Sequence, residues 1–225
     1  NAAAGTINRT ALPSGGAIVV SDRKPRLYGV YYMYTLTLLS AIGGFLFGYD
    51  TGIISGAMLL LVAEFHFTPH QQSLIVSITL LGCIVAAFGA IFLTECFGRR
   101  RTILMNSLVF AVGAAMMATC TGLYTLLAGR FVVGLAVGVV SVAVPMYIAE
   151  AAPPPQRGTL VALNHVFVTG GHLTACVVAG LFTHVDFPHS WRWMFWLAAI
   201  PAFVQLTGFL CLPESPRWLA KYKGK

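Results

Sequence analysis

The chain has 225 residues, of which 57% are apolar and 9% carry a charge, and its mean hydropathy is +0.79. These values lie far outside the range of water-soluble domains, so the sequence indicates a membrane protein. The net charge of +7 is divided among separate connecting segments, which gives little support to nucleic-acid binding.

Six apolar stretches have about the length that a helix needs to cross a membrane, since about 20 residues span roughly 30 Å of hydrocarbon. Each stretch is continuously apolar, whereas the strands of a membrane barrel alternate polar and apolar residues. The sequence therefore predicts an all-α membrane protein with transmembrane helices at 34–62, 73–93, 103–120, 123–148, 160–182 and 193–212.

Lys and Arg lie almost entirely in the connections on one side of this threading. The other side holds only Arg192, and Arg130 lies inside the fourth span. Cytoplasmic loops are enriched in basic residues, so both ends of the chain are predicted to be cytoplasmic. We expect a disordered cytoplasmic tail at 1–27, a six-helix bundle at 28–212 and the start of a cytoplasmic linker at 213–225.

The first span contains one carboxylate in an otherwise uncharged run. Asp50 is the only charged residue between Leu27 and Ala63. It lies about twelve residues, or ~18 Å, from the outer end of the span, which is too deep for a short side chain to reach bulk water. Such a carboxylate usually lines a cavity or pairs with a cation, so we expect a functional role for Asp50.

Glycines recur every four residues around Asp50 and form a smooth ridge on one helix face, where a neighbouring helix can approach closely. Asp50 is about 200° around the helix from the nearest of them, so it points away from the ridge. These glycines are Gly44, Gly48, Gly52 and Gly56.

Arg130 is the natural partner of Asp50 because it is the only basic residue inside a span. It lies about seven residues, or ~11 Å, from the outer end, and its long side chain can bridge the remaining depth. The alternative is that Arg130 extends alone to the outer surface. A carboxylate that is paired in one arrangement and protonated in another would couple proton movement to conformational change.

The fifth span carries three polar residues, Asn164, His165 and His172. His165 and His172 are seven residues apart, so they lie within about 20° of one helix face and can look into one cavity. The alternative is that neutral imidazoles form hydrogen bonds between helices. The residues alone leave both readings open.

Charged residues also gather at the predicted cytoplasmic ends of the spans, where opposite charges on neighbouring helices can pair. Single exposed pairs are typically worth only about 0–1 kcal/mol, but a network can contribute more. We refer to the following set as the charge latch: Glu95, Arg99, Arg100, Glu150, Arg157, Glu214 and Arg217.

Five motifs in a fixed order resemble the sugar-porter branch of the major facilitator superfamily. They are GGFLFGYDTG (43–52), FGRRR (97–101), GRFVVGLAVG (129–138), PMYIAEAAPPPQRG (145–158) and PESPRWL (213–219). Within that branch, GYDTG followed by ISGAMLLL, the TGGH run at 169–172 and WRWMFWLAAIPA look most like the proton-coupled myo-inositol transporters.

The resemblance implies a twelve-helix transporter of which this chain is the N-terminal half, with a second six-helix half as its partner. Family members with an aspartate at Asp50 and an arginine at Arg130 are typically proton symporters. The family's charge latch holds the two halves together in the outward-open state. Here Glu95 replaces the usual aspartate and Ile91 the usual glycine.

The resemblance also implies substrate contacts. Phe47 and Thr51 are similar in position to residues of the cavity wall. Glutamines usually occupy the positions of His165 and His172, and the first of them binds substrate hydroxyls. Imidazole offers a different set of hydrogen-bonding groups from an amide, so substrate preference here is expected to differ.

Three functions follow from this reading. The leading one is proton-coupled uptake of myo-inositol or a related polyol or sugar across the plasma membrane. The alternatives are a facilitative hexose uniporter and a non-transporting nutrient sensor on the same scaffold. Enzymatic motifs do not occur, so we expect no catalytic activity, no cofactor and no metal site.

Overall fold

The computed structural model describes residues 27–184, 189–212, 214, 215, 218 and 221. The predicted tail and linker lie largely outside these residues, as does Arg217. The described part of the chain is built from α-helices, and none of its residues lies in a strand.

All six predicted spans are present as helices long and apolar enough to cross a membrane, and most extend a few residues beyond the apolar stretches. In α2 and α5 the added turns contain polar or charged residues such as His70, Gln71 and Arg157, which hydropathy alone does not detect, whereas α1 gains residues 27–33. The helices are α1 (Leu27–Phe65), α2 (Pro69–Phe97), α3 (Arg99–Ala118), α4 (Leu123–Ala151), α5 (Arg157–His184), α6 (Ser190–Leu197) and α7 (Ala199–Cys211).

The sixth span differs from the prediction because it is broken into α6 and α7. Pro201 has no N–H to donate to the carbonyl of Leu197, and its ring clashes with that carbonyl in a regular helix. The N–H of Ala198 instead donates to the carbonyl of Phe195 at 3.2 Å, which tightens the chain at the junction. Pro145, by contrast, lies within α4 without interrupting it.

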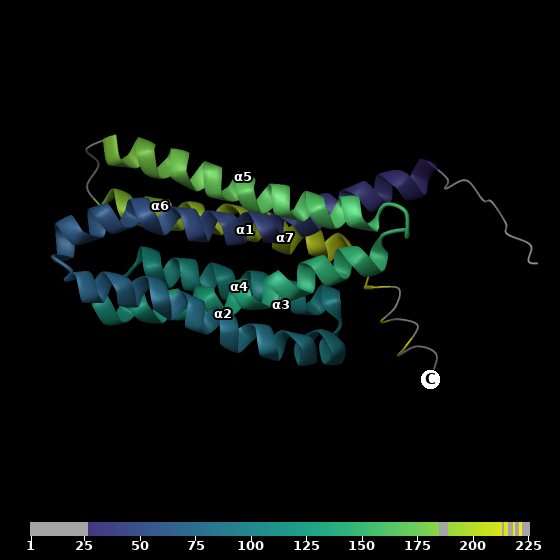
Figure 1. Cartoon of the computed structure of the whole chain (residues 1–225), viewed down its shortest axis with the longest axis horizontal. Helices are drawn as coiled ribbons and strands as arrows, with labels where there is room; N and C mark the ends of the chain where they lie inside the picture. The colour runs from purple at the N-terminus through teal and green to yellow at the C-terminus, as the bar shows by residue number, and fades with distance from the viewer. Residues whose placement is uncertain (1–26, 185–188, 213, 216–217, 219–220, 222–225) are drawn as a thin grey trace, which may run out of the picture.

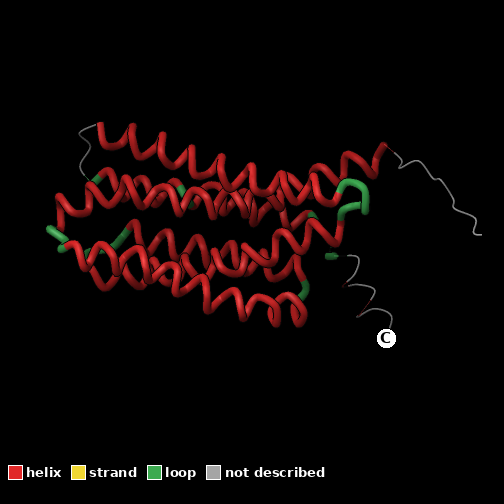
Figure 2. Tube along the Cα trace, viewed as in Figure 1, coloured by secondary structure: helices red, strands yellow, loops and turns green. Residues whose placement is uncertain are grey.

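The helices lie side by side in one bundle in which successive spans run in opposite directions (Figure 1), with α5 packed along α1 and with α2 and α3 packed on α4. Figure 2 shows the connections gathered at the two ends of the bundle. We call the end with the α2–α3 and α4–α5 connections the basic end, since it bears Arg99, Arg100, Arg101 and Arg157. The opposite end carries the α1–α2, α3–α4 and α5–α6 connections.

The glycine ridge of α1 faces α5, as its spacing predicts for a close helix contact. A Cβ added at Gly48 would fall on the carbonyl of Val168, and one at Gly52 would lie 2.8 Å from the Cβ of Ala175. Gly44 and Gly56 meet α5 in the same way. The absence of side chains on this face therefore brings the two backbones into contact.

A second close contact joins α2 and α4 around Gly82, Gly134 and Gly138, each of which meets the partner backbone. The apolar core lies between these helices and α3 and α6, and its side chains such as Ile53 and Val133 are 1% and 0% exposed. Helix α1 packs against α4, α5 and α7. It therefore lies near the middle of the bundle.

Candidate functional site

The site is built around an ion pair between α1 and α4. The Nη1 of Arg130 donates to the Oδ1 of Asp50 at 2.7 Å, and the two side chains are 2% and 5% exposed. The predicted partnership is therefore present, and Arg130 does not extend alone to the surface. Because burial penalises each charge separately, the two groups depend on each other to remain in the interior.

Helix α3 supplies a third residue to the site. The Sδ of Met117 lies 3.9 Å from the same Nη1 of Arg130, and Met117 is 1% exposed. A Cβ added at Gly129 would lie 2.8 Å from the Cγ of Met117, so the glycine before Arg130 lets α3 approach α4 here. The Nε of Arg130 is buried and has no hydrogen-bond partner among the described residues. The guanidinium is thus held by one carboxylate oxygen and a soft thioether.

The sequence did not single out Met117, because a methionine in an apolar span carries no signal of a polar neighbour. Tyr49, next to Asp50 in the chain, was also missed. Its hydroxyl donates to the backbone carbonyl of Met194 at 3.0 Å, which joins the middle of α1 to α6.

The five predicted substrate residues lie in different surroundings. Phe47 is half-buried, and Thr51 is exposed while its hydroxyl donates to the carbonyl of Phe47 at 2.8 Å. Asn164 is 5% exposed and packs against Gly44, and its Oδ1 has no partner among the described residues. The structure therefore separates Asn164, inside the α1–α5 contact, from the exposed Thr51.

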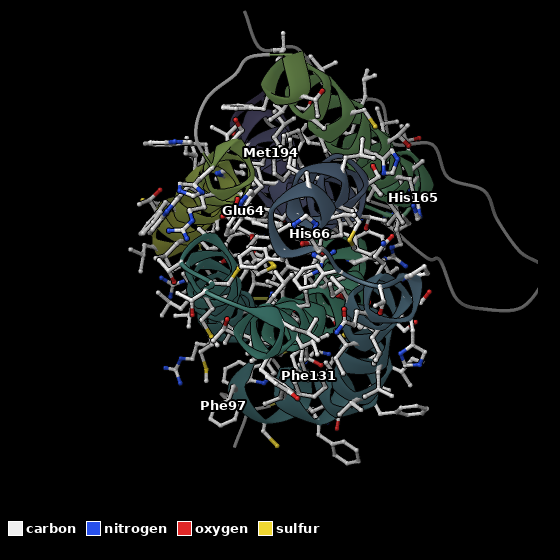
Figure 3. The ribbon with its side chains drawn as sticks, turned by 90° about the vertical axis from the view of Figure 1, so that its left-hand side faces the viewer. Glu64, His66, Phe97, Phe131, His165 and Met194 are labelled. Atoms are coloured by element: carbon white, nitrogen blue, oxygen red, sulfur yellow. The ribbon has the colours of Figure 1, made fainter. Side chains whose placement is uncertain are left out.

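The two histidines of α5 are both exposed, and Figure 3 shows His165 at the outer edge of the bundle. The backbone of His172 contacts Gly48 and Gly52, the glycines on either side of Asp50. His172 thus lies at the depth of the ion pair, with its ring outside the α1–α5 contact. Both rings are available to a partner or a substrate that approaches this face.

At the basic end, Arg99 and Glu150 are the only described charge-latch residues that form the predicted pair of opposite charges, while Arg100 bonds to Glu214 through its backbone. The Nη2 of Arg99 donates to the Oε1 of Glu150 at 2.8 Å. The backbone N–H of Arg100 donates to the Oε1 of Glu214 at 2.8 Å, and its guanidinium donates to the carbonyls of Phe209 and Leu210. These bonds connect α3 to α4, to α7 and to the segment after α7.

The remaining latch residues contribute less to this network. The side chain of Glu95 is exposed, and its backbone carbonyl accepts from the Nε1 of Trp218 at 3.0 Å. Arg157 is half-buried, and its Nε has no partner among the described residues. Ser215, which the sequence reading missed, donates its hydroxyl to the Oε2 of Glu150. No local pattern reveals that contact because the residues are 65 positions apart.

The opposite end has its own polar cluster, which joins α1 to the start of α6. The Oε2 of Glu64 accepts from the Nε1 of Trp191 at 2.6 Å, and its Oε1 lies 3.0 Å from the Nδ1 of His189. The guanidinium of Arg192 lies 4.9 Å from the centre of the Trp191 ring. In the nearby α3–α4 connection, burial raises the pKa of the Cys120 thiol to about 11.

Among the described residues, His, Cys, Asp and Glu form no group of three or more that could hold a metal ion. Taken with the six spans, the fold is that of an integral membrane protein in which a deeply buried ion pair joins two helices.

The chain belongs to the sugar (and other) transporter family, whose model matches residues 36–225. The human "Proton myo-inositol cotransporter" is 50% identical over 188 residues, which cover 84% of this chain and 29% of the relative. The "Glucose transporter GlcP" of Staphylococcus epidermidis is 39% identical over 192 residues, which cover 85% of this chain and 42% of the relative. These relatives are transporters and not enzymes.

The fold is also found in a solved member of the major facilitator superfamily. The proton:xylose symporter XylE, solved with bound 6-bromo-6-deoxy-D-glucose, superposes with a TM-score of 0.81 at 29% identity. The match covers 87% of this chain and 48% of XylE. The chain therefore spans about half the length of that structure and less than half of the curated relatives, and it has the fold expected for one half of the twelve-helix architecture.

Proposed function

We propose that the full-length protein takes up myo-inositol, or a related polyol or sugar, together with protons by alternating access. The observation that carries the proposal is the buried Asp50–Arg130 pair, with its single 2.7 Å bond. Separation of this pair in a dry cavity favours protonation of the carboxylate, and pairing favours its ionised form. The name of the human relative supports both the proton and the substrate.

Proton movement supplies enough energy for accumulation. One elementary charge that crosses 100 mV contributes about 2.3 kcal/mol, and about 1.4 kcal/mol corresponds to a tenfold concentration ratio. A membrane potential of this size therefore supports a roughly fifty-fold gradient of a neutral substrate before any pH difference is added.

We assign substrate contacts to Phe47, Thr51, Asn164, His165 and His172. Thr51 and the two histidines are exposed on this half and can take part in a cavity closed by the second half. Asn164 has a free Oδ1 but is 5% exposed, so a small rotation of α5 is needed before it meets a substrate hydroxyl. This requirement makes Asn164 the contact most dependent on conformation.

The second six-helix half is the partner that alternating access requires, because the substrate lies between two halves that rock against each other. The charge latch is assigned to hold them together in the outward-open state. We place the full-length protein in the plasma membrane with both ends of this segment in the cytoplasm, as the distribution of Lys and Arg predicts.

A facilitative hexose uniporter is the second candidate. It is favoured by the similarity to a glucose transporter and by the burial of the Asp50–Arg130 pair, which also suits a purely structural role. In this case the pair never separates during transport, and the carboxylate never takes up a proton.

The test is substrate-induced current from the full-length protein in voltage-clamped oocytes, with myo-inositol and glucose at pH 5.5 and 7.5. Asp50→Asn removes the ionisable group and nearly preserves its size. Thr207→Ser is the control, because Thr207 lies on α7 outside the assigned site and the serine keeps the hydroxyl that donates to the carbonyl of Phe203.

An inward current that grows at acid pH, persists in Thr207→Ser and disappears in Asp50→Asn supports proton-coupled uptake. Uptake of labelled substrate without current, unchanged in Asp50→Asn, would assign the protein to the uniporters. Normal surface expression with neither uptake nor current would favour the nutrient sensor.

A further inference from the structure

An apolar groove runs along the outer surface of the bundle near the basic end, away from the ion pair. It has a volume of about 280 Å³ and lies between α2 and α3, with α4 as its floor. Phe97, which Figure 3 shows at the periphery of the bundle, and Met105 are 46% and 51% exposed at its rim. The groove is therefore open to whatever surrounds the protein.

Gly89 in α2 keeps the groove open. A Cβ added at this position would meet no atom within 4 Å, unlike one at Gly82, which would lie 2.7 Å from the carbonyl oxygen of Phe131. Gly89 is thus not needed for contact between helices. Its missing side chain instead leaves room along the helix surface, next to Leu93.

A polar side chain without a partner lies in the wall of this groove. Asn106 is 6% exposed and lines the groove, and its side-chain amide makes no hydrogen bond with a described residue. Burial of an amide without hydrogen bonds is costly, so this group calls for a ligand that brings a hydrogen-bonding atom into an otherwise apolar channel.

A basic residue lies one helical turn from the groove lining, toward the basic end. Arg101 is exposed in the first turn of α3, one helical turn before Met105, and makes no ion pair with the described residues. Its neighbours Arg99 and Arg100 are occupied by Glu150 and by backbone carbonyls. Arg101 is therefore the free positive charge of the FGRRR motif.

We propose that this groove is a binding site for an anionic phospholipid. Arg101 binds the phosphate, Asn106 donates to an ester carbonyl, and one acyl chain lies in the space left by Gly89. Asn106 follows Arg101 by five residues, or about 7.5 Å along the helix and about 140° around it, so the long Arg101 side chain bends around α3 toward the groove. The order along the helix matches phosphate, ester and chain from the membrane surface inward. Basic pockets at the cytoplasmic side of membrane proteins commonly bind such headgroups.

The exposed face of α3 favours a lipid over the second half of the protein as the occupant. Its outward residues Met105, Leu108 and Val112 are apolar and 51%, 51% and 57% exposed. The exposed hydroxyl and imidazole groups that suit a water-filled passage lie elsewhere, on Thr51 of α1 and His172 of α5. An apolar surface with one basic residue at its end suits a lipid.

The test uses photocrosslinking from the full-length protein in vesicles of phosphatidylglycerol and phosphatidylcholine. Benzoylphenylalanine replaces Met105 in the groove, and mass spectrometry quantifies the lipid attached to it. The control probe replaces Phe203 of α7, which is 56% exposed and lies eight residues from the end of that helix.

We expect the ratio of phosphatidylglycerol to phosphatidylcholine adducts at Met105 to exceed that at Phe203 about fivefold. This factor corresponds to the roughly 1 kcal/mol that one basic residue contributes near an anionic surface. Arg101→Gln is expected to abolish the enrichment, and Gly89→Phe to reduce both adducts at Met105 at least tenfold. Gly180→Phe, at another open glycine on α5, is expected to leave them unchanged.

Equal lipid ratios at Met105 and Phe203, or adducts unaffected by Gly89→Phe, would overturn the proposal. Attachment of the Met105 probe to another segment of the full-length protein would also overturn it, because that result would identify a protein occupant.

Discussion

The middle and the basic end of the bundle use the same chemistry under different conditions. In the middle, Asp50 and Arg130 share one bond and are 5% and 2% exposed. At the basic end, Arg99 and Glu150 are 13% and 10% exposed, and Glu150 also accepts from Ser215. The central pair has no second partner of full charge, whereas the terminal pair belongs to a network.

This difference indicates that the central ion pair is suited to separate and re-form, whereas the network at the basic end is suited to keep its helices together. Loss of the single bond between Asp50 and Arg130 leaves a buried charge without compensation. Whether the Asp50 carboxylate then stays ionised depends on what else enters the cavity. At the basic end, Arg100 binds Glu214 and two carbonyls, so the loss of one hydrogen bond leaves others in place. We therefore expect substitutions in the middle to have larger and less local effects.

The largest expected effect is that of Arg130→Met. It leaves the Asp50 carboxylate buried and unpaired, which typically costs about 3–5 kcal/mol in the free energy of unfolding. The measurement is denaturant unfolding of the purified full-length protein in mixed micelles. The double variant Asp50→Leu/Arg130→Met is the control, and we expect it to recover most of the loss. A single variant as stable as the wild type would remove the distinction between the two regions.

Glu150→Ala is expected to have an intermediate effect. It leaves the Arg99 guanidinium and the Ser215 hydroxyl without their acceptor, at a cost of about 1.5–3 kcal/mol in the same unfolding measurement. Glu95→Ala is the matched control, since that side chain is exposed, and its cost is expected to stay within about 0.5 kcal/mol. Equal losses in the two variants would show that the network does not stabilise the basic end.

Ser215→Ala removes one bond of the network and leaves the Arg99–Glu150 pair in place. We expect a loss of about 0.5–1.5 kcal/mol, the usual net contribution of one hydrogen bond. Ser77→Ala, at an exposed serine of α2, controls for the substitution itself. A loss as large as that of Glu150→Ala would mean that the contact of Ser215, and not the ion pair, holds the network together.

Salt is expected to have the smallest effect. A rise from 0.1 to 1 M NaCl shortens the screening length from about 10 to 3 Å. The cost of Glu150→Ala should then fall by less than about 1 kcal/mol, because its ion pair is partly exposed. The cost of Arg130→Met should remain constant, since salt does not reach a pair that is 2% and 5% exposed. Equal salt dependence would indicate that water reaches the central site.

Much of the fold could be predicted because a membrane span is a local property. Length and apolarity identify each of the six helices without knowledge of its neighbours. The break between α6 and α7 was missed even though Pro201 is visible in the sequence. Pro145 shows why, since the same residue lies within an unbroken α4. Whether a proline interrupts a helix depends on the packing around it.

The candidate site was predictable where charge was scarce. The sequence predicts the Asp50–Arg130 pair because both residues lie deep in their spans and no other basic residue lies inside a span. The structure confirms it with a 2.7 Å bond. At the basic end there are many charged residues. There the sequence predicts which residues interact but not which of them bond to each other. Met117 was not predictable because an apolar residue acquires its role only through the neighbour that tertiary packing supplies.

The sequence by itself determined that the chain is a six-helix membrane bundle, that α1 has a face of glycines and that one carboxylate lies at depth. These features follow from local composition and from the geometry of a single helix. Only the tertiary structure decided that the glycines meet α5, that Asp50 turns toward Arg130, and that Asn106 lines an open groove. The physical reason is that these contacts join residues far apart in sequence, and close packing selects one arrangement among the many that helix periodicity allows.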